Sequence, residues 1–361
     1  MADSTLEWPD SKISNNALIE ACLGEIAELE NKGAYLEGIE LAVQYNRQYQ
    51  SPAIEETLVR LRQLAFTQVS KKPALKQWPW QVPDLFPDHH NKLVEISPER
   101  LDLDVLCSAI VHHGALLVRG LVHDQQAIDY LRSGIDRALE RYDAWAEGVP
   151  LSETTPWFTP MPALGEGAPG KLERTYVREK CGLLTADSPH MLHCLLELFH
   201  ERGILGIVEK YLGERPAISS KKATLRRVFP DLGRADWHQD GQFLDQGVGI
   251  RALNVWLSLS HCGDDAPGME IIARRLNRIV ETGTHDAMYD WTVSSEMVQQ
   301  TEELRSAVVK PLFEPGDVLF FDDWNLHKTS ITPEMTKTRY AVETWFFAPS
   351  KYPPKHAALM A

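Results

Sequence analysis

The sequence predicts an α+β protein: a double-stranded β-helix (jelly roll) core buttressed by helices, with a helical N-terminal extension. Apolar residues recur at helical spacing through the first 70 residues. After Pro216 the pattern changes to short apolar or alternating stretches separated by turn residues such as Pro315-Gly316-Asp317. Helices first and many short strands afterwards are typical of an antiparallel sandwich or jelly roll with helices packed against it.

We expect residues 1–70 to form an extension made of short helices. The third helix should begin after Ser51, with Pro52 at the first helical position, because these residue types suit an N-cap and a first turn. Three helices in antiparallel succession resemble one degenerate helical repeat, which cannot bury its own apolar face. The extension should therefore pack on the main domain, or alternatively serve as a homodimer contact or a surface for a protein partner.

Residues 71–88 form a Pro/Trp-rich linker, residues 89–349 the main domain, and residues 350–361 a C-terminal tail. A Pro/Gly-rich segment, 148–170, contains Trp157 and Phe158 and is either a surface excursion or a lid that presents aromatic side chains to a substrate. The pattern predicts helices over 101–113, 124–145, 187–213 and an insertion near 286–307. It predicts strands over 115–120, 223–229, 250–259, 269–272, 308–313, 318–321 and 340–347.

Composition narrows the class of function. The 361 residues carry a formal net charge of −14, which opposes phosphate backbones and anionic lipid and argues against nucleic-acid or membrane-surface binding. The five cysteines are scattered without a CxxC pair, which indicates free thiols in a reducing, cytoplasmic compartment. The polar start (1–14) does not look like a secretion signal, and no apolar run reaches the ~18–20 residues of a membrane span.

The chemistry gathers around Trp237-His238-Gln239-Asp240-Gly241 and a distant histidine, His327. Two residues two apart on an extended segment point to the same side, so His238 and Asp240 should share one face. This spacing also occurs by chance, but His327 follows a turn and a buried strand that can carry it to the same place. Two imidazoles and one carboxylate make a facial triad with open metal positions, which is typical of non-haem Fe(II) oxygenases.

A buried cation strengthens this hypothesis. Arg339 lies twelve residues beyond His327 and opens an apolar strand. A buried guanidinium needs an anionic partner, and a co-substrate carboxylate held by two parallel hydrogen bonds would provide one.

Over roughly 90–349 the sequence resembles the phytanoyl-CoA dioxygenase-like family of Fe(II)/2-oxoglutarate-dependent oxygenases. The matching blocks are GALLVRG (114–120), WHQDG (237–241), RALNVWL (251–257), DAPGM (265–269), PGDVLFF (315–321) and 326–330 followed by Arg339. The resemblance implies that His238, Asp240 and His327 bind Fe(II). It implies that Arg339, with Thr329 donating to the same end, holds the distal carboxylate of 2-oxoglutarate, and that Asn254 and Trp256 line that pocket. Arg227 either faces the pocket or is a surface cation.

The resemblance also bears on the reaction. Related halogenases replace the triad carboxylate with Gly or Ala, so Asp240 favours hydroxylation over halogenation. The expected activity is hydroxylation of an unactivated C–H bond of a small molecule by O2, with release of succinate and CO2. Two alternatives stay open: a non-catalytic jelly-roll protein that binds or senses metal and 2-oxoglutarate, and a zinc hydrolase in which Arg339 would have no evident role.

Overall fold

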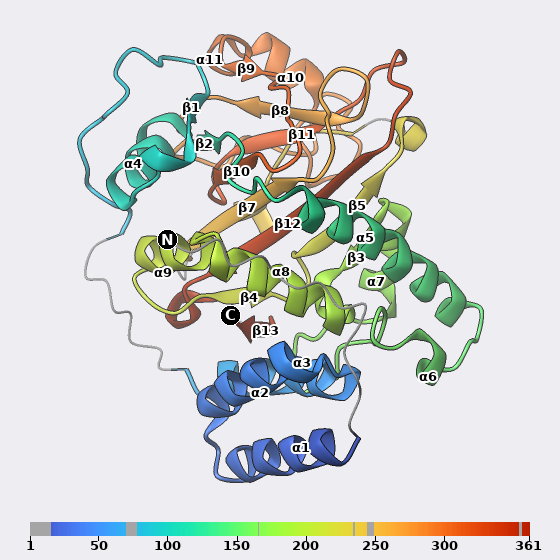
Figure 1. Cartoon of the computed structure of the whole chain (residues 1–361). Coiled ribbons are helices and arrows are strands. Elements are labelled where there is room, and N and C mark those ends of the chain that lie inside the picture. The colour runs from blue at the N-terminus through green and yellow to red at the C-terminus, as the bar shows by residue number, and fades with distance from the viewer. Residues whose placement is uncertain (1–15, 70–77, 165, 234, 244–248, 354–355) are drawn as a thin grey trace.

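A computed structural model describes residues 16–69, 78–164, 166–233, 235–243, 249–353 and 356–361. The expectation for residues 1–14 lies outside this part of the chain, as does most of the first half of the expected linker. The described residues combine helices with two β-sheets, as predicted (Figure 1). None of the helices in these ranges is long and apolar enough to cross a membrane.

The N-terminal extension consists of α1 (Asn16–Asn31), α2 (Tyr35–Tyr49) and α3 (Pro52–Thr67), close to the predicted positions. Figure 1 shows α3 beside α8 and the C-terminal strand β13, with α1 on the far side of the extension. Ile26, Ile39 and Ile54 are fully buried in a core that also contains Phe347 and Met360. The extension therefore completes its core against the main domain, and a role in dimerisation or partner binding stays a prediction.

Two sheets form the jelly roll. The larger has the order β1-β2-β10-β7-β12-β4-β13, with β5 paired to β12 and β3 to β5. The smaller has the order β6-β11-β8-β9, and among the strand pairs of the described residues only β1–β2 is parallel. The strands are β1 (Val94–Ile96), β2 (Ala115–Val118), β3 (Gly182–Leu184), β4 (Ala217–Ser219), β5 (Thr224–Val228), β6 (His238–Gln239), β7 (Ala252–Ser258), β8 (Gly268–Ile272), β9 (Val308–Val309), β10 (Val318–Phe321), β11 (Leu326–Ser330), β12 (Arg339–Phe347) and β13 (Ala358–Met360).

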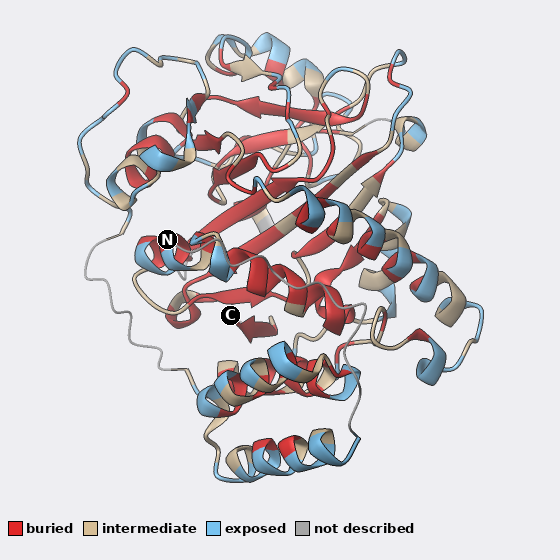
Figure 2. Cartoon of the chain, viewed as in Figure 1, coloured by how far each residue is buried: buried red, intermediate tan, exposed pale blue. Residues whose placement is uncertain are grey.

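Side chains alternate between two buried faces of the large sheet. Trp256 and Phe321 join Met269 and Ile271 of the small sheet in a core between the sheets. Val255, on the opposite face, belongs to the core that the large sheet shares with the helices. Figure 2 shows buried strands of this sheet beneath a layer of helices. That layer contains α4 (Leu103–Ser108), α5 (Gln125–Ala146), α8 (Pro189–Glu201) and α9 (Ile204–Leu212). Because successive strand residues face opposite sides, β7 can serve both the helical core and the interior of the jelly roll.

Several boundaries differ from expectation. The helix expected over 187–213 is interrupted at Gly203, whose φ of +71° ends α8 and starts α9. Within 286–307, only α10 (Ser295–Gln300) and α11 (Glu302–Arg305) are helical. Part of the expected tail forms β13, which pairs with β4. The limits of the domains themselves stay predictions.

The segment 148–170 is not an aromatic lid. It contains α6 (Leu151–Thr154) and leads into α7 (Lys171–Glu179). Phe158 is fully buried in the helical core, and the ring of Trp157 lies 4.6 Å from that of His190. Trp157 is partly buried and packs against the core that encloses Phe158. No described residue of 148–170 lines the two cavities beside His238, so the lid alternative is wrong.

Candidate metal and co-substrate site

The two histidines meet because their strands pair. In the antiparallel β6–β11 pair, His238 lies directly opposite His327. Directly opposed residues of an antiparallel pair project to the same face, and the two ring centroids are 4.4 Å apart. Sheet register thus joins residues separated by almost ninety positions in the sequence.

Asp240 reaches the same place by a turn. The extended segment ends at Gln239, and the chain enters a short 3-10 turn over Asp240–Phe243. The prediction that His238 and Asp240 share an extended segment is therefore only half right. Even so, Asp240 Oδ1 lies 3.7 Å from His238 Nε2, and one ligand atom from each of His238, Asp240 and His327 falls within 4.8 Å of the others.

The turn after Asp240 is held by a close approach of two backbone segments. The Gly241 N–H donates to the Asp323 carbonyl at 2.8 Å, and a Cβ added at Gly241 would lie 2.8 Å from that same oxygen. A side chain at this position would push the two segments apart. The Gln239 side chain adds further support by donating to the Trp324 carbonyl at 2.8 Å. Gln239 and Gly241 therefore fix the position of Asp240, which lies between them in the sequence.

The electrostatic state of the cluster suits a cation. Burial lowers the pKa of His238, reinforced by the neighbouring His327, and burial also lowers the pKa of His327. Both imidazoles are therefore neutral near pH 7, with lone pairs to offer. Burial raises the pKa of Asp240 well above its ordinary value, so its ionised form needs a compensating positive charge nearby.

Backbone orients His327. Its Nδ1 lies 3.2 Å from the Asn325 carbonyl oxygen, which can only accept, so Nδ1 carries the proton and Nε2 keeps its lone pair. Two acidic residues just before His327, Asp322 and Asp323, have other contacts. Asp322 instead pairs with Arg275, and Asp323 contributes its backbone carbonyl to Gly241.

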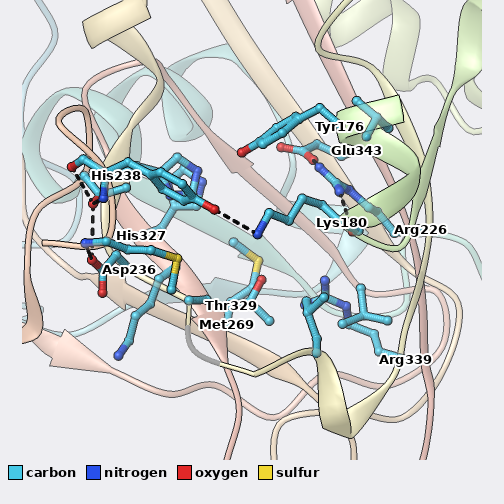
Figure 3. Close-up of a pocket in the computed structure, with 18 of the residues that line it drawn as sticks. Tyr176, Lys180, Arg226, Asp236, His238, Met269, His327, Thr329, Arg339 and Glu343 are labelled. Carbon is cyan, nitrogen blue, oxygen red and sulfur yellow. Dashed lines mark hydrogen bonds and ion pairs between the residues drawn. The ribbon is translucent and has the colours of Figure 1, made fainter. Parts of the chain in front are cut away.

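Arg339 lies in the same cavity as the histidines (Figure 3). This first cavity has a volume of about 190 Å³ and is also lined by Thr329 and Trp256. Arg339 is buried and donates from Nη1 to the Gly268 carbonyl at 2.9 Å, while its Nε has no hydrogen-bond partner among the described residues. Burial lowers the pKa of Arg339 to about 10, which still leaves it a cation at neutral pH. A guanidinium held in this way is ready for a carboxylate.

Of the two β7 residues predicted to line the co-substrate pocket, Trp256 lies there, with its ring 5.7 Å from the Arg339 guanidinium carbon. Asn254 is not among the residues that line the cavity. Its amide is buried beside Asp240 and favours the ionised form of that carboxylate. The side-chain amide of Asn254 makes no hydrogen bond of good geometry to the described residues.

Arg227 does not face the cavity. It points to the helical side of β5 and pairs with Asp136 of α5 at 2.7 Å. The neighbouring Arg226 takes the inward position instead. Adjacent strand residues face opposite sides, so which arginine points inward depends on the register of β5 against β12.

One site residue was missed from the sequence. Glu343, in the middle of β12, accepts hydrogen bonds from Thr224 at 3.1 Å, Arg226 at 3.4 Å and the Trp345 indole at 3.3 Å. Burial would raise the pKa of Glu343, but Arg226, His327, the Trp345 indole and His238 together outweigh burial and lower that pKa. The signal in the sequence was an acidic residue inside the otherwise apolar run 340–347.

These residues fit a metal ion. Two neutral imidazoles and one carboxylate, all on one side, form a donor set suited to a divalent transition metal with open positions. The unsatisfied Arg339 Nε at the other end of the cavity fits a second, anionic ligand that reaches from the guanidinium to the metal.

Comparison with known proteins gives one family match and several solved structures of similar fold. The family model for phytanoyl-CoA dioxygenase (PhyH) matches residues 110–331, more than half of the chain. No match is found among curated proteins. Among solved structures, similarity extends to EctD from S. alaskensis with 2-oxoglutarate and 5-hydroxyectoine (17% identity, 77% of this chain and 87% of that chain, TM-score 0.46). It also extends to AviO1 from Streptomyces viridochromogenes (16%, 71% and 98%, TM-score 0.42) and to the carbocyclase SnoK from nogalamycin biosynthesis (14%, 70% and 86%, TM-score 0.42).

Proposed function

We propose that this chain, which belongs to the phytanoyl-CoA dioxygenase (PhyH) family, is the hydroxylase form of an iron- and 2-oxoglutarate-dependent oxygenase. Its substrate would be a small molecule with an unactivated C–H bond, and succinate and CO2 would be released. The observation that carries the proposal is the pairing of the buried His238, Asp240 and His327 group with Arg339, whose Nε is unsatisfied, in one cavity.

Each residue has a definable task in this proposal. His238 and His327 would present neutral nitrogens to Fe(II), and Asp240 would supply the negative charge that stabilises the ion. Arg339 would bind the distal carboxylate of 2-oxoglutarate, with Thr329 beside it on β11. When bound, iron and 2-oxoglutarate supply the oxidising chemistry with O2, and the buried walls exclude water and fix orientation. The presence of Asp240 favours hydroxylation over halogenation.

The first experiment measures binding and turnover of the co-substrate. Under anaerobic conditions, Fe(II) and 2-oxoglutarate together should produce the visible charge-transfer absorption of the chelate. On admission of O2, succinate should form slowly even without the primary substrate. A folded protein that binds neither iron nor 2-oxoglutarate would contradict the proposal.

The same experiment separates the alternatives. Tight binding of both ligands, without decarboxylation across a broad substrate panel, would favour a sensing protein. Hydrolytic activity with zinc that disappears with iron would favour a hydrolase. Once a substrate is known, ¹⁸O2 should place labelled oxygen in the product. A product that has lost two hydrogens and carries no ¹⁸O would contradict the hydroxylation proposal. It would still be compatible with an iron- and 2-oxoglutarate-dependent oxygenase.

A further inference from the structure

A second cavity adjoins the one described above. Its volume is about 470 Å³, within the range of about 300–1,000 Å³ usual for small-molecule sites. It is lined by Asp240 but not by His327, Thr329 or Arg339. The residues common to both cavities are Tyr176, Val177, Arg226, His238, Trp291 and Glu343. The two spaces therefore meet at the metal ligands, and a molecule in the second cavity would lie beside His238 and Asp240.

The charged groups that line the second cavity balance one another. Its described lining contains three cations and three carboxylates: Lys221, Lys222, Arg226, Glu173, Asp240 and Glu343. His238 adds no charge near pH 7, because burial lowers its pKa. Fe(II) and 2-oxoglutarate, a dication and a dianion, would leave this balance unchanged. The described wall therefore has no net charge with which to attract an ion of either sign.

Two of the cations are paired directly with two of the carboxylates. Lys221 lies 3.0 Å from a carboxylate oxygen of Glu173, and Arg226 lies 3.4 Å from one of Glu343. The first cavity differs in this respect, since the Nε of Arg339 has no hydrogen-bond partner among the described residues. An unsatisfied cation suits an anionic ligand, whereas cations that already have carboxylates do not require one.

The third cation, Lys222, interacts with an aromatic ring and a carboxylate. Its ammonium lies 5.0 Å from the centre of the Trp345 ring. Burial lowers the pKa of Lys222, and Asp240 is the strongest of the charges that oppose this shift. An anion that approached Lys222 would compete with Asp240 and add a second negative charge near it.

Much of the remaining lining is aromatic or aliphatic and comes from three separate segments. Leu172, Tyr176 and Val177 lie on α7, Trp345 lies on β12, and Trp291 lies in the segment before α10. Leu172 and Tyr176 are one turn apart on α7 and are 85% and 44% exposed, so the apolar surface continues from the cavity to its rim. Such a wall binds an apolar body by removing its surface from water.

The aromatic faces do not favour a cation. Aromatic rings attract cations, but the Trp345 ring already has the Lys222 ammonium near it. Trp291 stacks on Tyr289 with ring centroids 5.1 Å apart, and the Lys180 ammonium lies 5.6 Å from the centre of the Tyr289 ring. A cationic ligand on either aromatic group would be repelled by the lysine beside it.

We propose that the second cavity selects an uncharged organic molecule with an apolar body, and discriminates against anions and cations of the same shape. This inference rests on the proposed function. The aromatic and aliphatic wall contacts the apolar body, and a C–H bond is placed beside His238 and Asp240. An ion that enters the cavity loses water and finds the charges of the described wall already balanced, so it binds less tightly than the neutral molecule.

Three naphthalene probes of similar size test the proposal by direct binding. They are the neutral 1-naphthalenesulfonamide, the anionic 1-naphthalenesulfonate and the cationic 1-naphthylmethylammonium. Calorimetric titrations use the full chain, once with saturating 2-oxoglutarate and Mn(II) as an inert substitute for iron, and once without either. The sulfonamide should bind at least about tenfold more tightly than either ion in both series. A sulfonamide that binds no more tightly than either ion overturns the inference.

Variants of the ion pair at the cavity rim test whether charge balance causes the preference. Glu173→Gln keeps an oxygen for the Gly170 N–H but leaves Lys221 without its carboxylate. It should strengthen sulfonate binding and weaken ammonium binding by about threefold each, the modest effect expected of a partly exposed pair. Lys221→Gln should shift both affinities in the opposite directions. Sulfonamide binding within twofold of wild type in both variants shows that the cavity is intact.

The matched control removes a paired carboxylate from outside both cavities. Glu303→Gln frees Arg278, which lies 2.7 Å from this carboxylate, and it should change the binding of none of the three probes. Ion affinities that stay at the wild-type values in both Glu173→Gln and Lys221→Gln overturn the inference.

The outcome is separable from that of the proposed function. Iron and 2-oxoglutarate binding without any preference for the neutral probe refutes the substrate class and leaves the oxygenase proposal standing. A preference for the neutral probe in a protein that does not bind iron and 2-oxoglutarate supports the selectivity of the cavity and refutes the oxygenase proposal.

Discussion

Two buried polar clusters of the protein contain similar residue types. They differ in whether their polar side-chain atoms have hydrogen-bond partners within the protein. The ligand cluster contains His238, Asp240, His327 and Arg339. The anchoring cluster contains Glu55 of α3, Tyr130 of α5 and His190 of α8. In the anchoring cluster the His190 Nδ1 lies 2.8 Å from Glu55 Oε1, and its Nε2 lies 2.6 Å from the Tyr130 hydroxyl.

The histidines of the two clusters have opposite charge tendencies. Burial opposes protonation of His190, but the Cys194 sulfur and the Glu55 carboxylate outweigh it and raise the pKa of His190. In the ligand cluster burial prevails and lowers the pKa of both histidines. A buried histidine with a carboxylate bonded to one nitrogen and a hydroxyl to the other serves the fold. A buried neutral histidine whose Nε2 is left to the cavity is available to a metal.

The strongest test of this comparison removes a member of the ligand cluster. Asp240→Ala and His327→Ala should each reduce Fe(II) affinity by more than about 100-fold, because even residues that merely support ligands are worth about 10–100-fold. Anaerobic equilibrium dialysis with metal analysis measures the loss. Asp136→Ala removes a carboxylate that pairs with Arg227 outside the cavity, and it should bind iron like the wild type. Affinities within threefold of wild type in both ligand variants would contradict the assignment.

Removing a member of the anchoring cluster should lower stability and leave iron affinity unchanged. His190→Gln leaves Glu55 as a buried charge without its counter-ion, which costs roughly 3–5 kcal/mol of unfolding free energy. Urea unfolding measures this, and iron affinity of the folded variant should be unchanged. His261→Gln is a matched control, since this imidazole also contacts carboxylates, Asp264 and Glu314, but is partly exposed. It should cost no more than about 1 kcal/mol.

A double variant checks that Glu55 and His190 act as a pair. Glu55→Gln with His190→Gln should destabilise the protein less than the sum of the two single changes, because no charge is left buried. Strict additivity would show that the two side chains are independent and that the extension is anchored elsewhere.

The unsatisfied arginine provides a third test. Arg339→Gln should raise the dissociation constant for 2-oxoglutarate by about 30-fold or more, since truncating one partner of a buried charge pair costs roughly 2–5 kcal/mol. The anaerobic absorption titration measures it, and iron affinity should change little. Arg227→Gln, one residue from the inward Arg226 but outside the cavity, should leave both affinities unaltered. Unchanged 2-oxoglutarate affinity in Arg339→Gln would place the co-substrate elsewhere.

The sequence is informative about the ligand cluster because its residues either lie close together in the chain or follow recognisable strands. The His238–Asp240 spacing and the strands before His327 and Arg339 can all be read from a single chain. The inward arginine could not be identified, because a one-residue change of register exchanges Arg226 and Arg227 between the faces of β5. Glu343 was hidden in a run of apolar residues, where only the pairing of β12 with β5 brings Thr224 and Arg226 to it.

The anchoring cluster could not be predicted at all. Glu55 and His190 are 135 residues apart, and nothing in either local pattern refers to the other. Their contact follows from how α3 docks on α8, which depends on the shape of the whole helical layer. The same reason explains Trp157 and Phe158, whose aromatic character is equally compatible with a substrate lid and with the core they occupy.

The smallest effect concerns pH, and it follows from the raised pKa of His190. A raised folded-state pKa means that the stabilisation is fully present below the unfolded value of about 6.5 and declines as pH rises toward the folded value. The groups facing His190 are Glu55, Tyr130 and Cys194. The difference in unfolding free energy between wild type and His190→Gln should therefore be constant below pH ~6 and shrink by roughly 1–2 kcal/mol between pH 6.5 and 8. Urea unfolding of both proteins across this range measures it, and the subtraction removes groups that titrate equally in both. If the unfolding free energies of the two proteins vary with pH in parallel, His190 is neutral in the folded protein. The two clusters would then differ only in their hydrogen bonds and not in the charge of their histidines.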